Sequence, residues 1–296
     1  MLSLLVASLS VVVAALPAQK AAPKAPERVH IIGASVSGGF EDGPMTGAEV
    51  AGDSCSLHHV LKRWADGEVR VTTHPTLEMC MLFMDPVTRG KKMIERAQKK
   101  DADLIVAVDF PFWFAYGYVN GDELEQRSAR FEKGLAFLAE FDVPVLVGDL
   151  PDMRGASTRL LSPRQVPSKD VLGKLNERLK QWAGEHPNVT LVPLAETVQQ
   201  LKDDGVTLPL EGGAKKTPPG ALLQGDRLHA TRLGVAFLVH RLQEPLRAAF
   251  PKGHALHEQQ WTFEQFVEAA GAEVTLEDVL AKAEANAKNE DAKAGK

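Results

Sequence analysis

The sequence is poor in several residue types, and each shortage narrows what the protein can be. Its 296 residues include two cysteines, two tyrosines and 6% aromatic residues, and the formal net charge is −5. Two cysteines are too few for a disulfide-dense scaffold or a four-cysteine zinc site. No dense basic stripe offsets the negative charge, so we expect no nucleic-acid partner and no basic surface for anionic lipid. Hydrophobic residues reach 44%, enough for a sizeable core.

Long apolar runs are also scarce, and the one present is at the N-terminus. Residues 1–16 read MLSLLVASLSVVVAAL, shorter than the roughly 20 residues of a comfortable membrane span. Small residues follow up to Ala18. We interpret 1–18 as a cleaved signal peptide and 19–27 as a linker, which predicts a secreted or periplasmic protein without a stable membrane span. A retained anchor is the alternative, because no cation precedes the apolar run.

The few thiols and scattered histidines predict no metal centre and no cofactor. Export would allow a disulfide between Cys55 and Cys80, and two buried thiols are the equally weighted alternative. His58 and His59, with Asp53 nearby, could suggest a metal. Adjacent helical histidines point about 100° apart, however, and seldom share one ion.

Short apolar segments alternate with segments of helical spacing along most of the chain. The expected strands are Arg28–Ile32, Glu68–Thr73, Leu104–Val108, Val143–Val147 and Val189–Val192. The expected helices are Pro86–Lys100, Glu123–Phe141, Ser168–Glu185 and Arg232–Phe250. This alternation predicts an α/β fold with three α/β/α layers around a mostly parallel five-stranded sheet.

The C-terminal part has a different character. We place the α/β domain at 28–253 and a helical extension with a disordered tail at 254–296. Within the extension, Thr262–Gln265 and Thr275–Asp278 have the pattern of helix starts with a capping partner three residues on. Beyond Ala281 almost nothing apolar remains to be buried.

A serine follows the first expected strand, in the sequence Gly33-Ala-Ser35-Val-Ser37. Chemistry gathers at the carboxyl ends of strands in an open parallel sheet, so Ser35 is a candidate nucleophile. By itself a serine near glycines is an ordinary turn signal.

The segment before the last expected helix supplies the groups that a serine nucleophile needs. Asp226 and His229 are three residues apart, so the carboxylate can orient the imidazole, which in turn can take the serine proton. The plain alternative is that Asp226 caps the last helix and His229 sits in its first turn.

These two blocks resemble those of the SGNH, or GDSL, hydrolase family. The resemblance covers roughly Val29 to Phe250 and implies a flavodoxin-like α/β/α fold and a serine esterase or acyl hydrolase activity. It implies that Ser35 is the nucleophile, His229 the general base and Asp226 the orienting carboxylate. The chain departs from the family at Ala34, where the family has aspartate.

Further departures concern the oxyanion hole, for which the family uses a glycine after the second strand and an asparagine after the third. Here the corresponding segments read Thr72-Thr-His-Pro75 and Val108-Asp-Phe-Pro. The replacement candidates for oxyanion or substrate binding are Thr72, Thr73, His74 and Asn120, besides the Ser35 amide. Asp109 cannot donate as a carboxylate, and could instead hold a neighbouring loop. The aromatic loop around Trp113 could wall a substrate pocket or simply pack beneath its own loop.

Three functions follow as hypotheses. The first is an exported serine esterase acting on a small-molecule, lipid or carbohydrate ester. The second is a weak or inactive relative that binds a ligand or an envelope partner, which the missing oxyanion residues favour. The third is acyl transfer to a carbohydrate. Substrate identity, acyl length and oligomeric state are not predicted.

Overall fold

The main sheet is built from five strands of four residues each. A computed structural model describes residues 25–40 and 54–272. The strands are β1 (Arg28–Ile31), β2 (Arg70–Thr73), β3 (Leu104–Ala107), β4 (Val145–Gly148) and β5 (Val189–Val192). They are all parallel and stand in the order β2-β1-β3-β4-β5. This flavodoxin-like order confirms the predicted fold class.

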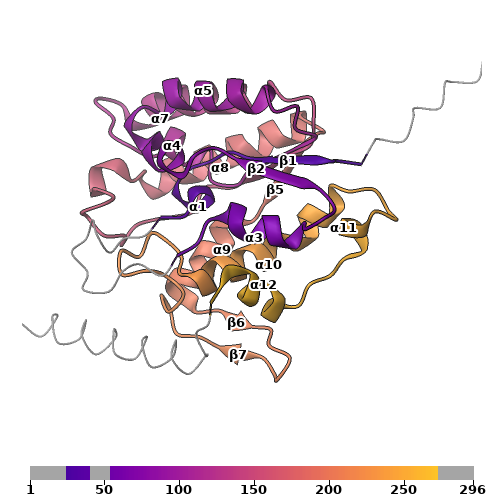
Figure 1. The fold of residues 1–296 in the computed structure, drawn as a ribbon. Helices are drawn as coiled ribbons and strands as arrows, with labels where there is room; N and C mark the ends of the chain where they lie inside the picture. The colour runs from indigo at the N-terminus through magenta and orange to yellow at the C-terminus, as the bar shows by residue number, and fades with distance from the viewer. Residues whose placement is uncertain (1–24, 41–53, 273–296) are drawn as a thin grey trace, which may run out of the picture.

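Helices cover both faces of the sheet (Figure 1). The longer ones are α3 (Leu57–Trp64), α5 (Pro86–Gln98), α7 (Glu123–Leu138), α8 (Lys169–Glu185), α10 (Arg232–Ala248) and α12 (Phe263–Ala270). The shorter α-helices are α1 (Ser35–Gly38), α4 (Thr76–Cys80), α6 (Phe112–Ala115), α9 (Leu194–Gln199) and α11 (Ala255–Glu258). The described residues also include two short 3-10 helices, η1 (Met81–Met84) and η2 (Pro163–Gln165), and one π-helical segment, η3 (Gln200–Asp204). A separate hairpin pairs β6 (Thr207–Leu208) with β7 (Lys215–Lys216).

The two faces of the sheet bury two different cores. Alternate residues of a strand point to opposite faces, so the four residues of β3 divide between them. Leu104 and Val106 face the helices α3, α10 and α12, whereas Ile105 and Ala107 face α5, α7 and α8. Both cores are apolar, which is why the central strands β3 and β4 read as continuous hydrophobic runs.

Side-chain caps set where several helices begin. Asp85 accepts a hydrogen bond from the Thr88 amide at the start of α5, and Asp122 does the same for Glu125 at α7. Thr231 accepts from the Gly234 amide at α10. Asp226 therefore does not cap α10, which leaves its carboxylate available for other contacts.

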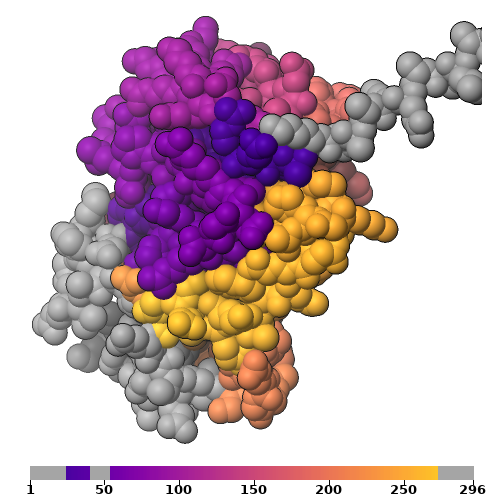
Figure 2. Space-filling view, turned by 45° about the vertical axis from the view of Figure 1, so that its right-hand side comes forward, coloured from indigo at the N-terminus to yellow at the C-terminus, as the bar shows by residue number. Residues whose placement is uncertain are grey.

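The helices after residue 254 lie against the N-terminal half of the chain. In Figure 2 the C-terminal helices lie beside the segment that holds α3. Gln259 donates to the Trp64 carbonyl and Arg63 donates to that of Glu268, while Phe263 and Phe266 are fully buried. The predicted capping box at Thr262 is present, with Gln265 as its partner. The expected helix start at 275–278, the signal peptide at 1–18 and most of the linker lie outside the described residues.

Candidate active site

Ser35 stands where β1 ends, as the first residue of the short helix α1. β1 runs to Ile31, and the chain then turns through Gly33 and Ala34. Ser35 is half-buried at the carboxyl edge of the sheet, next to the centre strand β3. The serine is thus at the edge where ligands of such folds bind.

Asp226 and His229 form one tight turn before α10. One oxygen of the carboxylate, Oδ1, accepts the amides of Leu228 at 2.8 Å and His229 at 2.9 Å. The other, Oδ2, lies 2.6 Å from Nδ1 of the His229 ring. Arg227, between them, has a φ of 54°, a left-handed conformation that a residue with a side chain adopts at some cost.

The turn is buried, and this affects the charge of Asp226. Burial works to raise the pKa of the carboxyl. The hydrogen bond and charge of the His229 ring, with the amides of His229 and Leu228, outweigh it and hold the pKa below its usual value. Asp226 is therefore an anion at neutral pH, suited to stabilise a positive imidazolium.

The His229 ring joins this turn to Ser35. Its Nε2 lies 2.8 Å from the Ser35 Oγ, across 194 positions of sequence. Because Nδ1 donates to a carboxylate, Nε2 is the nitrogen left to accept the serine proton. Phe40 stacks on the ring with centroids 4.2 Å apart, which restricts its rotation. The three side chains form one hydrogen-bonded chain from alcohol to carboxylate.

Asp109 supports the turn that carries Ser35. Its Oδ2 accepts the amides of Val36 at 2.8 Å and Ser37 at 3.2 Å, and its Oδ1 accepts the Ser37 hydroxyl at 2.5 Å. The Ala34 amide is a further partner. Burial raises the pKa of this carboxyl despite these hydrogen bonds. Asp109 thus holds a neighbouring loop, the alternative considered from the sequence.

The other side chains predicted as oxyanion donors are either bonded to backbone carbonyls or exposed on a loop. The Thr73 hydroxyl donates to the Ile31 carbonyl, and Nε2 of the buried His74 donates to that of Met93. Asn120 is exposed on the loop after α6. None of these three side chains is hydrogen-bonded to Ser35 among the described residues. The Thr72 hydroxyl donates to the Val29 carbonyl.

The aromatic loop packs inward for the most part. Trp113 is buried, with its ring 5.0 Å from Phe112 and 5.7 Å from Phe83. Phe114 and Tyr116 are fully buried as well. Tyr118 is different, because 61% of it is exposed. The loop therefore supplies core residues from its first part and one surface ring from its last.

Some supporting residues left no readable signal in the sequence. Phe40 follows two glycines in a segment of no clear period, and its stacking on His229 is a contact with a distant part of the chain. Gly33 lies close to the Asp109 carboxylate, which follows a different strand, so the need for a glycine there also depends on a distant residue. A glycine after a strand signals a turn, but not what occupies the space it leaves.

The remaining sequence predictions concern cysteines and metals. Cys55 and Cys80 are half-buried and do not form a disulfide with each other. Burial raises the pKa of the Cys80 thiol to about 11. Within residues 25–40 and 54–272, no group of three or more histidine, cysteine or acidic side chains could hold a metal ion. In the same stretches, no helix has the length and apolarity to cross a membrane.

Comparison with known proteins finds several solved structures that resemble this chain, among them two of low identity. No family model and no curated protein matches the chain. One match is a gut microbial diltiazem-metabolizing enzyme, with TM-score 0.43 and 13% identity over 76% of this chain, which spans 48% of that protein. Another is an acetyl xylan esterase, with TM-score 0.44 and 14% identity, covering 74% of this chain and 99% of that protein.

Proposed function

We propose that this protein is an exported serine hydrolase that cleaves esters through an acyl-enzyme. The observation that carries the proposal is the hydrogen-bonded chain from Ser35 through His229 to Asp226. A serine hydroxyl is a weak nucleophile until a base takes its proton, and here the base is in contact and oriented. The proposal requires no metal ion or organic cofactor.

The proposed reaction has two halves. In the first, Ser35 Oγ attacks the ester carbonyl carbon while His229 Nε2 takes the hydroxyl proton. The tetrahedral intermediate collapses, and the alcohol leaves with that proton, which leaves an acyl group on Ser35. In the second, a water gives its proton to His229 and attacks the acyl carbon, and the acid leaves as the proton returns to Ser35.

The Ser35 amide is the proposed oxyanion donor. Asp109 takes the amides of Ala34, Val36 and Ser37, and the amide of Ser35 is not part of that set. Fixed amides on both sides hold the Ser35 backbone in place. A preorganised N–H of this kind stabilises developing negative charge without reorganisation during the reaction.

A fluorophosphonate probe tests the proposal directly. We expect it to label Ser35, and we expect Ser35→Ala to abolish both labelling and the turnover of p-nitrophenyl acetate. Ser128→Ala, on α7, removes a serine away from the site and is the matched control, expected to retain both. Absence of labelling and turnover in folded wild-type protein would contradict the proposal and favour a non-catalytic binding protein.

Export is a separate part of the proposal. It depends on residues 1–18, whose apolar run and following small residues are typical of a signal peptide. N-terminal sequencing of protein recovered from the envelope or medium should give a start close to residue 19. An intact Met1 on that material would contradict cleavage.

A further inference from the structure

A large cavity opens at the carboxyl edge of the sheet, and it shares no lining residue with the small hollow that contains Ser35. It has a volume of about 730 Å³, within the range of small-molecule sites. Its wall comes from residues 118–120, which follow α6, from Glu123 and Arg127 of α7, and from residues within 153–168, which follow β4. The hollow lined by Ser35 and His229 has only about 10 Å³. Any bulky part of a substrate needs space elsewhere.

The cavity wall is bonded to the turn that holds the imidazole. The Ser157 amide donates to the Asp226 carbonyl at 2.7 Å, and the residues on both sides of it, Ala156 and Thr158, line the cavity. Leu228 packs on the same apolar core as Met153, which also lines the cavity. The cavity thus borders the Asp226–His229 turn.

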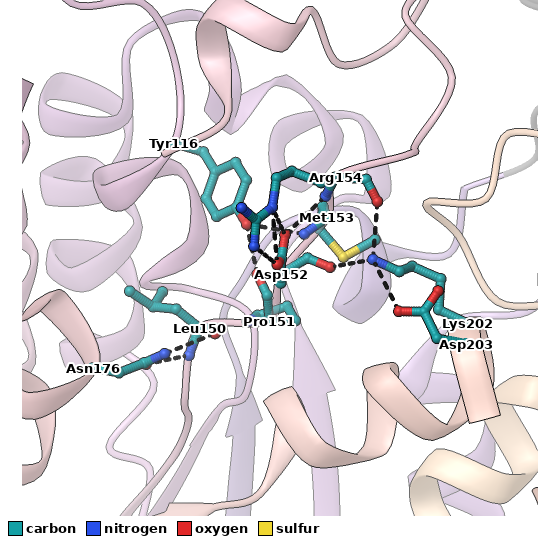
Figure 3. A network of polar contacts seen from close by, with 9 residues as sticks. All are labelled: Tyr116, Leu150, Pro151, Asp152, Met153, Arg154, Asn176, Lys202 and Asp203. Atoms are coloured by element: carbon teal, nitrogen blue, oxygen red, sulfur yellow. Dashed lines mark hydrogen bonds and ion pairs between the residues drawn. The ribbon is translucent and has the colours of Figure 1, made fainter. Parts of the chain in front are cut away.

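The loop on the β4 side is held rigid by buried polar groups (Figure 3). The Tyr116 hydroxyl donates to the Pro151 carbonyl and accepts the Met153 amide. From the other side, Nζ of the buried Lys202 donates to the carbonyls of Asp152 at 2.7 Å and Arg154 at 2.9 Å. A wall fixed in this way needs little ordering when a ligand binds.

The loop on the α6 side is fixed by two arginines of α7. Arg127, 1% exposed, donates to the carbonyls of Ala115 and Gly117 at 2.7 and 2.9 Å. Arg130 donates to the Tyr118 carbonyl. The backbone that carries the exposed Tyr118 ring is therefore preorganised as well.

The arginines on the cavity wall differ in whether a carboxylate of the protein already pairs with them. Arg127 is paired with Glu123 at 2.9 Å, and Arg154 is paired with Asp152. Arg164, on η2, makes no side-chain ion pair or hydrogen bond among the described residues. The wall therefore offers a guanidinium with donors in a planar fork.

The remaining wall groups match a polyhydroxylated ligand. Tyr118 presents a flat apolar face with a polar edge, Asn120 presents an amide, and Thr158 presents a hydroxyl. Apolar residues line the cavity as well, namely Val119, Met153, Ala156, Leu161, Pro163, Val166 and Pro167. One ring to stack on, with donors and acceptors around it, suits a sugar ring better than a long acyl chain, which has no polar atoms to satisfy.

We propose that this cavity binds the carbohydrate part of an acylated saccharide, with a sugar ring on Tyr118 and its oxygens on Arg164. The inference rests on the proposed function, since it places the alcohol part of the ester whose acyl group Ser35 would take. The Asp226–Ser157 hydrogen bond fixes one wall of the cavity relative to the turn that carries His229, so a sugar bound there would be held in a constant place relative to the imidazole.

The test compares acetylated saccharides with an aryl ester that has no sugar. The substrates are partially acetylated glucose, xylotriose and galacturonic acid, with p-nitrophenyl acetate as the reference. Tyr118→Ala and Arg164→Ala should each raise KM for at least one saccharide about tenfold and lower its kcat/KM relative to the reference. Tyr118→Phe, which keeps the ring, should retain most of the wild-type ratio.

Arg70→Ala is the matched arginine control, because Arg70 is exposed at the start of β2, the opposite edge of the sheet. It should leave the ratio unchanged. The cavity proposal is overturned if every variant cleaves p-nitrophenyl acetate and the ratio of kcat/KM for the saccharide to kcat/KM for p-nitrophenyl acetate is the same in all of them. That result leaves the esterase proposal standing. A KM effect on long-chain esters in place of saccharides also overturns the cavity proposal.

Binding separates the two proposals if no ester is cleaved. Calorimetric titration of the Ser35→Ala protein with the same saccharides should show binding that Tyr118→Ala, added to it, weakens about tenfold. Binding with this dependence supports the cavity even where turnover is absent. Absence of saccharide binding to Ser35→Ala protein of native fold overturns it.

Discussion

Gly33 and Asp109 follow different strands of the sheet and occupy adjoining space. A methyl group on Gly33 would lie 2.0 Å from Oδ1 of Asp109 and 2.4 Å from the Ser37 hydroxyl oxygen. Carbon does not approach oxygen that closely, so one side must move. The carboxylate that holds the Ser35 turn fits only because residue 33 has no side chain.

Gly33→Ala should therefore displace Asp109 from the turn. We expect a loss of roughly 1–3 kcal/mol in the free energy of unfolding, typical of overpacking, and at least a tenfold loss of the proposed esterase activity. Gly173→Ala on α8 is the matched control, since nothing lies within 4 Å of its added methyl group. It should leave activity unchanged and stabilise slightly, by about 0.5–1 kcal/mol. Urea unfolding and p-nitrophenyl acetate assays measure both, and equal behaviour of the two variants would contradict this interpretation.

Asp109→Ala and Asp109→Asn should differ. Alanine leaves the buried amides of Val36 and Ser37 without an acceptor, at a cost of about 1–3 kcal/mol each. Asparagine keeps an oxygen for these amides and an amide group for the Ser37 hydroxyl oxygen, so it should retain the fold and most activity. If the asparagine variant is as damaged as the alanine variant, the amide acceptor is not the role of Asp109.

Comparing the wild type with Asp109→Asn tests how the stability of the fold depends on the protonation of Asp109. Burial raises its pKa above the ordinary value of 3.8, so the unfolded chain releases this proton at lower pH than the folded chain does. Folding therefore favours the protonated, neutral Asp109 carboxyl. The stability that this group adds to the fold is lost as pH rises through its raised pKa. The wild type should lose thermal stability relative to Asp109→Asn as pH rises above about 4.

Asp226→Asn should separate the fold from the activity. The asparagine oxygen can still accept the amides of Leu228 and His229, but its NH₂ group then faces His229 Nδ1, which favours the wrong tautomer. We expect a fall in kcat of about 10³–10⁴-fold with little change in the melting temperature. A kcat within tenfold of wild type would contradict the orienting role of the carboxylate.

His30 should make the fold sensitive to acid. Burial, followed by the charges of His74, Lys100 and His58, lowers the pKa of His30 from 6.5 to about 4. Between pH 4 and pH 6.5 the unfolded chain therefore binds a proton that the folded chain does not. The neutral His30 contributes fully to the free energy of unfolding above pH 6.5, and this contribution is lost as pH falls towards 4. It amounts to about 3 kcal/mol, taking about 1.36 kcal/mol for each pKa unit.

His30→Gln removes this titration and keeps a donor for the Thr72 hydroxyl oxygen that the ring contacts. Urea unfolding at pH 4.5 and pH 7.5 should show a smaller loss of stability on acidification than in the wild type. Some loss should remain, because burial also lowers the pKa of the neighbouring His74. An unchanged pH dependence would show that His30 does not titrate in this range.

The central sheet could be predicted because its information is local. Runs such as Leu104–Ala107 are buried on both faces, so they appear as continuous apolar segments, and the long helices carry caps or apolar spacing. The short helices α4 and α9 were not predicted. Helices of five or six residues are held by tertiary packing and leave little pattern in the sequence.

The candidate site divides in the same way. Ser35 follows a strand and Asp226 precedes His229 by three residues, so sequence position alone made them candidates, and the structure brings them into contact. Their catalytic roles stay predictions until activity is measured. The supporting residues Asp109, Gly33 and Phe40 each contact a residue far away in the sequence. A single sequence does not indicate which distant residues come into contact, so these contacts could not be predicted.

The proposed nucleophile and its base are far apart in the sequence, so the candidate site can assemble only late in the synthesis of the chain. His229 joins Ser35 across 194 positions, so a chain that is still being synthesised has the serine without the proposed base. The proposed pair would therefore assemble only after the segment before α10 has been synthesised and has docked beside the turn that follows β1.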